Sequence, residues 1–266
     1  MSSHDTPDTR FLADRHAIVT GGGRGIGAAI ATSLAAAGAN VTVMGRDVGV
    51  LRAQANRLRE DYGVEAAACA CDVTLEESVR TAFDSATAEL GSAYVLVNNA
   101  GQAEGRPFLE TSLDLWERLL AVNVTGAFLC TRAVLGAMLE ARAGRVVNIA
   151  STTGLKGYRN VAGYTASKHG LVGLTRALAA ETARRGVTVN AVCPGYTDTE
   201  MTERAVSNIV RDLGRSEEDA RALIARSSRR GTLIEPREVA SAVIWLCSPD
   251  ATAVSGQAIV VAGGEV

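Results

Sequence analysis

The chain has 266 residues, of which 47 % are hydrophobic and 21 % are charged, and its formal net charge is −2. This length suits one large α/β domain that needs no disulfide or metal to hold its core together. The nearly balanced charge gives no indication of a nucleic-acid or membrane partner, and we expect neither. The five cysteines include no CxxC pair and the three histidines are scattered. We therefore expect free thiols, no metal site and a cytoplasmic location.

The start of the chain is polar and has no apolar stretch of the kind found in signal peptides. We interpret residues 1–13 as a flexible tail and residues 14–266 as a single domain, because no Pro/Gly/Ser-rich linker interrupts them. Short apolar segments then alternate with longer helical ones. Strands are expected at His16–Thr20, Asn40–Met44, Val64–Ala70, Ala93–Asn98, Arg145–Ala150, Val187–Cys193 and Ala258–Val261. Helices are expected at Ile26–Ala37, Gly49–Asp61, Leu75–Leu90, Leu113–Arg142, Gly163–Arg185 and Pro236–Cys247.

The expected strands are nearly continuous in apolar residues, which is typical of a parallel sheet buried by helices on both faces. Repeated strand–helix alternation predicts an α/β fold with a doubly wound, seven-stranded parallel sheet of the Rossmann type. The charged segment Thr199–Leu233 does not fit this alternation. A connection of this length predicts a substrate lid, and the alternative is a permanently docked helix pair that caps the sheet.

A glycine-rich turn joins the first strand to the first helix, with the spacing TGxxxGxG from Thr20 to Gly27. Glycines let a phosphate approach the backbone closely, and a helix N-terminus offers free N–H groups to it. The turn therefore predicts a dinucleotide-binding site. Its expected contact residues are Gly21, Gly23, Arg24, Gly25, Ile26 and Gly27.

A second pattern indicates proton transfer. Tyr164 and Lys168 are four residues apart in an expected helix, so their side chains share a face, and Ser151 directly follows the fifth strand. Reduction of a carbonyl by hydride leaves an alkoxide that needs a proton. A tyrosine with a pKa near 10 can supply it if a neighbouring ammonium lowers that pKa. We expect Tyr164 to be the acid/base and Ser151 to hold the carbonyl oxygen.

These motifs together resemble the short-chain dehydrogenase/reductase family. The TGxxxGxG turn, Asn98-Asn-Ala-Gly101, Asn123 in an Asn-Val-Thr-Gly stretch, Ser151, the Tyr164/Lys168 pair and Pro194-Gly195 lie in the family's order over residues 14–264. The resemblance implies an oxidoreductase that interconverts a ketone and a secondary alcohol with a nicotinamide cofactor. It implies four catalytic residues, namely Asn123, Ser151, Tyr164 and Lys168. The role that the resemblance implies for Asn123 is to hold a water that connects Lys168 to solvent.

The resemblance also implies further cofactor contacts. Asp72 and Val73 match the adenine position, and the backbone of Thr197 with the hydroxyl of Thr199 matches the nicotinamide position. Asn98 is expected to pin neighbouring strands instead of touching substrate. The remaining expected contacts are Asn99, Ala100, Gly101, Tyr164, Lys168, Pro194 and Gly195.

The choice of nicotinamide depends on the end of the second strand. At this position the family usually carries an acidic residue that binds the ribose hydroxyls. This chain has Gly45 there, followed by Arg46. An arginine can fork around a 2′-phosphate, and Arg24 adds a second cation, so we expect NADP(H) to be favoured over NAD(H). In the alternative, Asp47 binds the ribose and Arg46 is a solvated charge. Asp47 can also simply cap the following helix.

Within the family, Gly144–Gly154, Tyr164–Gly173 and Thr188–Gly195 look like β-ketoacyl thioester reductases, acting on acyl-carrier-protein or coenzyme A thioesters, and like aromatic polyketide ketoreductases. We therefore expect a 3-oxoacyl thioester or related ketone as substrate. The alternatives are an NAD-dependent dehydrogenase of a secondary alcohol or hydroxyacyl-CoA and, more remotely, a non-catalytic nucleotide-binding regulator. Pocket walls are expected at Gln102–Pro107, Thr152–Arg159 and Tyr196–Val210.

The two long helices, Leu113–Arg142 and Gly163–Arg185, are apolar on more than one side. One side must pack on the sheet, and another is available to a second subunit. Family members commonly form tetramers through these helices. We expect a homotetramer closed by two-fold symmetry, with a dimer as the alternative.

Overall fold

The computed structural model describes residues 10–266, apart from the side chain of Asp212. Within these residues seven parallel strands form one sheet in the order β3-β2-β1-β4-β5-β6-β7, which confirms the predicted Rossmann-type α/β fold. The chain order reverses beside β1, between β1 and β4, and ligands bind at such a switch point in doubly wound sheets. The strands are β1 (His16–Thr20), β2 (Asn40–Gly45), β3 (Ala66–Ala70), β4 (Ala93–Asn98), β5 (Gly144–Ile149), β6 (Val187–Pro194) and β7 (Ala258–Val261).

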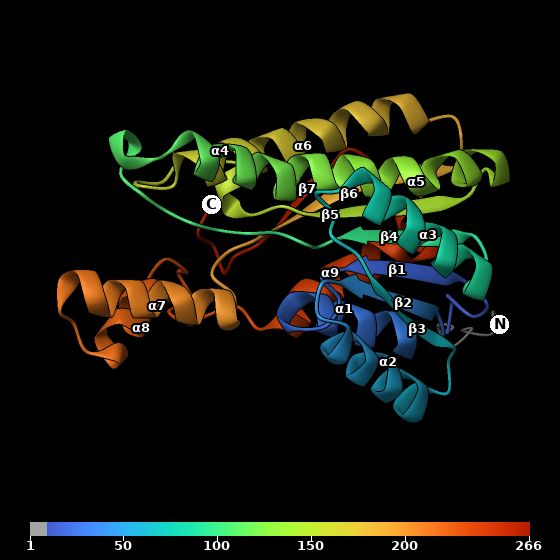
Figure 1. Cartoon of the computed structure of the whole chain (residues 1–266), viewed down its shortest axis with the longest axis horizontal. Coiled ribbons are helices and arrows are strands. Elements are labelled where there is room, and N and C mark those ends of the chain that lie inside the picture. Colours follow the sequence, from blue (N-terminus) through green and yellow to red (C-terminus); the bar gives the residue numbers. More distant parts are fainter. Residues whose placement is uncertain (1–9) are drawn as a thin grey trace, which may run out of the picture.

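Helices cover both faces of the sheet (Figure 1). One face carries α1 (Gly25–Ala36), α2 (Val48–Tyr62) and α9 (Pro236–Cys247), and the other carries α3 (Glu76–Leu90), α5 (Gly126–Ala141) and α6 (Ala162–Thr182). Because strand residues are apolar on both sides, each face has its own core. Leu34, Leu58 and Leu246 belong to the first core, and Phe83, Leu129 and Met138 to the second.

The expected helix Leu113–Arg142 is interrupted. It consists of α4 (Leu113–Leu120), a π-helical turn at Ala121–Thr125, and α5. By length and composition alone, Leu113–Ala141 resembles a membrane-spanning helix, yet 44 % of its most apolar window is buried inside the protein. Cys130 and Met138 of this stretch lie in the core beneath the sheet. Packing within the fold therefore accounts for part of this apolarity.

Buried asparagines link the centre of the sheet. The Nδ2 of Asn98 on β4 donates to Asn148 Oδ1 on β5 (2.8 Å) and to Thr131 Oγ1 on α5 (2.9 Å). Asn148 Nδ2 in turn donates to Thr175 Oγ1 on α6 (2.8 Å). The interpretation of Asn98 as a pin between strands is confirmed. The network holds α6, which carries Tyr164 and Lys168, in register with β5.

The expected tail is wrong for its last residues. Arg10–Asp14 form a turn, and Leu12 is 1 % exposed and donates its N–H to Ala37 O (3.0 Å). An apolar side chain that reaches the core at this point ties the N-terminal turn to the end of α1. Residues 1–9 of the expected tail lie outside the described residues.

The segment Thr199–Leu233 forms a helix pair, α7 (Glu200–Leu213) and α8 (Glu217–Ala225), that projects away from the sheet (Figure 1). The two helices share a small core of their own around Val206, Ala220 and Ile224. The residues that flank the helix pair meet at its base, where a β-bridge joins Thr197 to Ile234. The helix pair is therefore attached through its base and packs mainly on itself.

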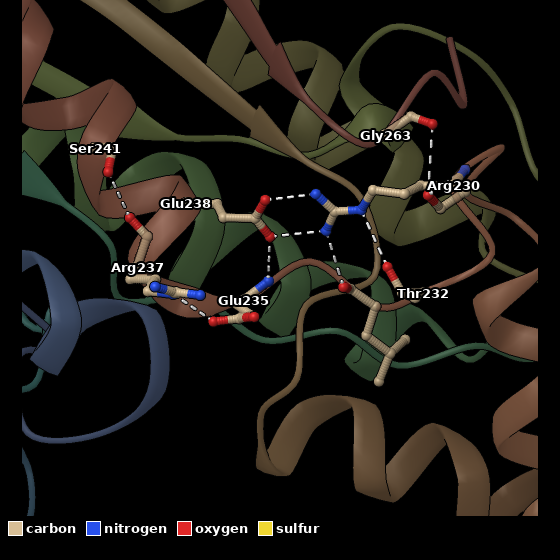
Figure 2. A network of polar contacts seen from close by, with 9 residues as sticks. Arg230, Thr232, Glu235, Arg237, Glu238, Ser241 and Gly263 are labelled. Carbon is tan, nitrogen blue, oxygen red and sulfur yellow. Dashed lines mark hydrogen bonds and ion pairs between the residues drawn. The ribbon is translucent and has the colours of Figure 1, made fainter.

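The base of the helix pair is held by charge-assisted contacts (Figure 2). Arg230 donates to both carboxylate oxygens of Glu238 on α9 (2.6 and 2.8 Å) and to Leu233 O (3.2 Å). Glu238 also accepts from the backbone N–H of Glu235, completing a capping box at the start of α9. A bidentate arginine–carboxylate pair of this kind fixes orientation as well as distance.

Candidate active site

The turn between β1 and α1 has room only for glycine at its closest points. A Cβ on Gly27 would lie 2.1 Å from Gly21 O, and Gly21 itself has a φ of 63°. Asn99, at the end of β4, donates its side-chain N–H to Thr20 O (3.0 Å) and Gly21 O (3.1 Å). The Arg24 side chain, at the N-cap of α1, makes no capping hydrogen bond in the described structure, which leaves the first-turn N–H groups to other acceptors. This cradle fits the pyrophosphate of a dinucleotide.

The expected adenine side lies at the ends of β2 and β3. Asp72 Oδ1 accepts from the backbone N–H (3.0 Å) and hydroxyl (2.7 Å) of Thr74. These bonds lower the pKa of Asp72, with a smaller contribution from the charge of Arg46. Arg46 is exposed, and Val73 is packed against Gly126. An ionised carboxylate and a guanidinium thus lie close together at this edge.

Asp47 caps the start of α2, accepting from Val50 N at 3.3 Å. Its other oxygen pairs with Arg24 (3.2 Å), and Arg24 also reaches Glu200 at the start of α7 (3.4 Å). The cap interpretation of Asp47 is confirmed. Arg24 therefore connects the glycine turn, the end of β2 and the helix pair in one surface network.

Tyr164, Ser151 and Lys168 meet where β5 ends and α6 begins. Desolvation raises the pKa of Tyr164, and the hydroxyls of Ser151 and Thr153 oppose the shift in part. The expected net lowering of the Tyr164 pKa by Lys168 is wrong for this structure. The Lys168 Nζ lies 5.7 Å from the centroid of the Tyr164 ring and donates to Ile149 O (2.8 Å), and the described structure shows no hydrogen bond from it to the phenol oxygen.

Lys168 is 4 % exposed, and desolvation lowers its pKa from 10.5 to about 8. A Cβ on Gly101 would come within 3.5 Å of the Lys168 Nζ and 3.0 Å of Asn123 Oδ1. Gly101 therefore keeps open the space between these two side chains. The ammonium remains predominantly charged at neutral pH while buried beside the ring of Tyr164.

Asn123 lies in the π-helical turn and is 1 % exposed. Its Nδ2 donates to Gln102 O (2.9 Å) and Ser167 Oγ (3.0 Å), and its Oδ1 accepts from Gln102 N (3.0 Å). The amide therefore fixes the loop that follows β4 against α6. The water expected beside Asn123 stays a prediction.

The turn after β6 is tightly bonded within itself. Gly195 N donates to Val261 O (3.0 Å), and the hydroxyls of Thr199 (3.3 Å) and Thr202 (2.5 Å) both donate to Thr197 O. Pro194 and Thr197 are buried. The expected nicotinamide residues thus form one internally hydrogen-bonded turn at the same edge as Tyr164.

Two features of the site were missed by the sequence analysis. Thr153 lies by the Tyr164 hydroxyl, and its only sequence signal was its place two residues after Ser151. Glu265 contacts Lys156 and Tyr158, which lie in the expected pocket wall Thr152–Arg159. The end of the chain showed no pattern that indicates such a contact.

The comparisons with known proteins agree with this geometry. The family model described as short chain dehydrogenase matches residues 15–209. A protein described as a ketoacyl reductase of the granaticin polyketide synthase of Streptomyces violaceoruber is 42 % identical over 97 % of this chain and 95 % of its own. The 3-oxoacyl-[acyl-carrier-protein] reductase FabG of Aquifex aeolicus is 39 % identical, covering 95 % and 98 %. A crystal structure of an actinorhodin polyketide ketoreductase variant with NADPH has a TM-score of 0.91 at 42 % identity, covering 94 % and 97 %.

Fold and site together define a nicotinamide-dependent oxidoreductase that acts on an alcohol or ketone carbon. The chain belongs to the short chain dehydrogenase family, as its motifs indicated.

Replacement of Lys168 by Met is expected to abolish activity and to stabilise the fold. A folded pKa of about 8 against 10.5 means that the buried ammonium costs about 3 kcal/mol when both states are protonated. Loss of the bond to Ile149 O offsets about 1 kcal/mol. Urea unfolding at pH 7 should show Lys168→Met to be more stable by about 2 kcal/mol.

That advantage should shrink as pH rises from 8 to 10.5, because the folded wild type releases its proton first. Arg57→Met, at an exposed position of α2, is the control and should show no such trend. A Lys168→Met protein less stable than wild type by the same amount at pH 7 and pH 10 would contradict the burial argument.

Proposed function

We propose that this enzyme reduces a ketone to a secondary alcohol with NADPH, and that its substrate is a 3-oxoacyl thioester, carried by coenzyme A or a carrier protein, or a related polyketide ketone. The observation that carries the proposal is the meeting of Ser151, Tyr164 and Lys168 at the sheet edge beside the glycine turn. The substrate class is supported by relatives that are 39–42 % identical and are named ketoacyl or 3-oxoacyl reductases.

In the proposed chemistry, the nucleotide would supply a hydride to the carbonyl carbon. Side chains of the protein bind the carbonyl oxygen and give it a proton. The hydroxyls of Ser151 and Tyr164 donate to the carbonyl oxygen and hold it at the end of β5. Tyr164 then gives its proton to the alkoxide oxygen. The Lys168 ammonium, charged at neutral pH, stabilises the tyrosinate that remains.

The relatives favour ketone reduction over the alternative of an NAD-dependent alcohol dehydrogenase, since proteins 39–42 % identical to this chain are named ketoacyl or 3-oxoacyl reductases. The complete set of Asn123, Ser151, Tyr164 and Lys168 likewise argues against a non-catalytic regulator.

Tyr164→Phe keeps the ring and removes the proton donor. We expect kcat for ketone reduction to fall at least about 100-fold, the scale of a positioned acid, with little change in NADPH affinity. Steady-state kinetics and fluorescence titration measure the two effects. Tyr62→Phe, at the end of α2, is the matched control. Near-normal turnover by Tyr164→Phe would refute the assignment of the acid.

The preference for NADP(H) is supported by the charges around the end of β2. Arg46 is exposed there, and Arg24 lies on the same side. The Asp47 carboxylate is already used by its helix cap and by Arg24, which leaves it less available to ribose hydroxyls. A 2′-phosphate would meet two guanidinium groups at this position.

Arg46→Ala should lower kcat/KM for NADPH by about 10- to 100-fold, the equivalent of about 1.5–3 kcal/mol for a lost charge-assisted contact. The value for NADH should barely change, because NADH lacks the 2′-phosphate. Arg52→Ala, elsewhere on α2, serves as the charge-matched control. A wild-type enzyme that prefers NADH would overturn the assignment and make Asp47 the leading ribose ligand.

We also propose that Thr199–Leu233 is a lid that orders over cofactor and substrate. The helix pair packs on its own core and leaves Met201 and Leu213 45 % and 62 % exposed, so apolar surface is available for closure. The base around Arg230 is clamped to α9, which confines the motion to α7 and α8.

Hydrogen exchange tests the lid. Amides of residues 199–215 should exchange quickly in the free enzyme and slow markedly in the ternary complex. Amides of α9 should show equal protection in both states. Equal protection of the helix pair with and without ligands would mean a fixed cap, and substrate selection would then come from rigid walls.

We propose a homotetramer, with a dimer as the alternative. The loop before α4 and the outer sides of α4 and α5 expose Phe108, Leu109, Leu113 and Phe128 at 72 %, 97 %, 70 % and 43 %. Exposed apolar side chains on these elements are typical of a subunit interface.

The five cysteines are buried and free, which suits the expected cytoplasmic setting.

Light scattering at micromolar concentration should give about four times the chain mass of 27.6 kDa. Phe128→Glu should shift the distribution to smaller species, because it places a charge in the proposed interface. A single species of one chain mass would refute the tetramer.

A further inference from the structure

A buried carboxylate lies at the very end of the chain. Glu265 is the second-last residue, yet its side chain is only 4 % exposed. After β7 the chain turns through Gly263 and Gly264, whose φ values of 57° and 84° suit glycine, and brings Glu265 back to the catalytic edge of the sheet. Burial of a carboxylate is costly unless its oxygens have partners. The partners of Glu265 therefore indicate what it does.

One set of partners lies on the loop that follows Ser151. The Tyr158 hydroxyl donates to Glu265 Oε1. The Lys156 Nζ donates to the backbone oxygen of Glu265 (3.0 Å) and lies 3.8 Å from Oε1. This loop forms the expected substrate-side wall of the pocket. The chain end thus holds that wall by two side-chain contacts.

The other side of Glu265 faces the turn after β6. A Cβ on Gly195 would lie 2.8 Å from Glu265 Oε2, so the carboxylate is packed directly against this turn. Burial raises the pKa of the neighbouring Tyr196, and the charge of Glu265 adds a smaller increase. Tyr196 in turn contributes to the raised pKa of Tyr164. One carboxylate therefore lies between the substrate-side loop and the expected nicotinamide turn.

The turn that carries Glu265 is supported from behind. Ser228 Oγ donates to Gly263 O (3.4 Å), and Gly264 is packed against Arg229. The adjacent Arg230 is fixed to Glu238 on α9 (Figure 2). The C-terminal turn is thus held between the base of the helix pair and the edge of the sheet that carries Tyr164. Its contacts on both sides fix the position of Glu265.

We propose that Glu265 is a positioning and specificity-determining residue, which sets the spacing between the Lys156–Tyr158 loop and the Gly195–Tyr196 turn and thereby determines how a ketone fits beside Tyr164. The proposal rests on the proposed function for its choice of substrate. Since Glu265 acts on the walls and makes no contact with the Tyr164 proton, its loss weakens substrate binding more than the chemical step.

Three variants test the proposal with a ketone that the wild type reduces. Glu265→Ala should raise KM for the ketone at least fivefold and leave kcat within twofold. Glu265→Gln keeps an oxygen that accepts from Tyr158 and should restore KM to within twofold of wild type. Tyr158→Phe should raise KM as Glu265→Ala does. Val266→Ala, at the exposed last residue, is the control and should match wild type.

A second measurement does not depend on turnover. Hydrogen exchange of residues 155–161 should be faster in Glu265→Ala than in wild type without ligands, while exchange of α9 is unchanged. If the wild type reduces no ketone, the proposed function fails and this exchange result still decides the role of Glu265. Unchanged exchange, an unchanged KM in Glu265→Ala, or equal impairment in Glu265→Gln and Glu265→Ala would each overturn the proposal.

Discussion

The proposed chemistry of this protein depends on the close packing of the start of α1 against the turn that follows β1. Gly27 must lie against Gly21 O, at a distance that admits no side-chain carbon. Asn99 locks this contact from the end of β4. Because every strand of the sheet is parallel, the ends of β5 and β6 open onto the same edge. The site is a direct consequence of strand direction combined with one tight turn.

The proposed catalytic groups are placed there at a cost to stability. Lys168 is a charged group in a buried position, and its lowered pKa is the sign of that cost. The asparagine network around Asn98 and Asn148 and the apolar cores on both faces outweigh it. Active sites commonly contain one locally unfavourable feature, such as this buried charge, within a surrounding structure that is well packed and hydrogen-bonded. The burial that lowers the pKa of Lys168 also raises the pKa of Tyr164.

The sequence predicted those parts of the structure that depend on local pattern. Continuous apolar strands required a two-sided parallel sheet, and the spacing of Tyr164 and Lys168 placed them on one helix face. The direction of the Tyr164 pKa shift could not be predicted, because it depends on desolvation by the surrounding fold, which the hydroxyls of Ser151 and Thr153 only partly oppose. Contacts between distant segments, such as the burial of Leu12 and of Glu265, likewise depend on the three-dimensional packing.

The most direct test of the account is a panel of carbonyl and alcohol substrates, followed through the absorbance of the reduced nicotinamide with each nucleotide in parallel. The panel should include a 3-oxoacyl-CoA thioester, related ketones and simple secondary alcohols. The account predicts consumption of NADPH with the thioester or a related ketone, and much slower reaction with NADH. Alcohol oxidation with NAD as the only measurable activity, or no turnover of any compound with either nucleotide, would contradict it.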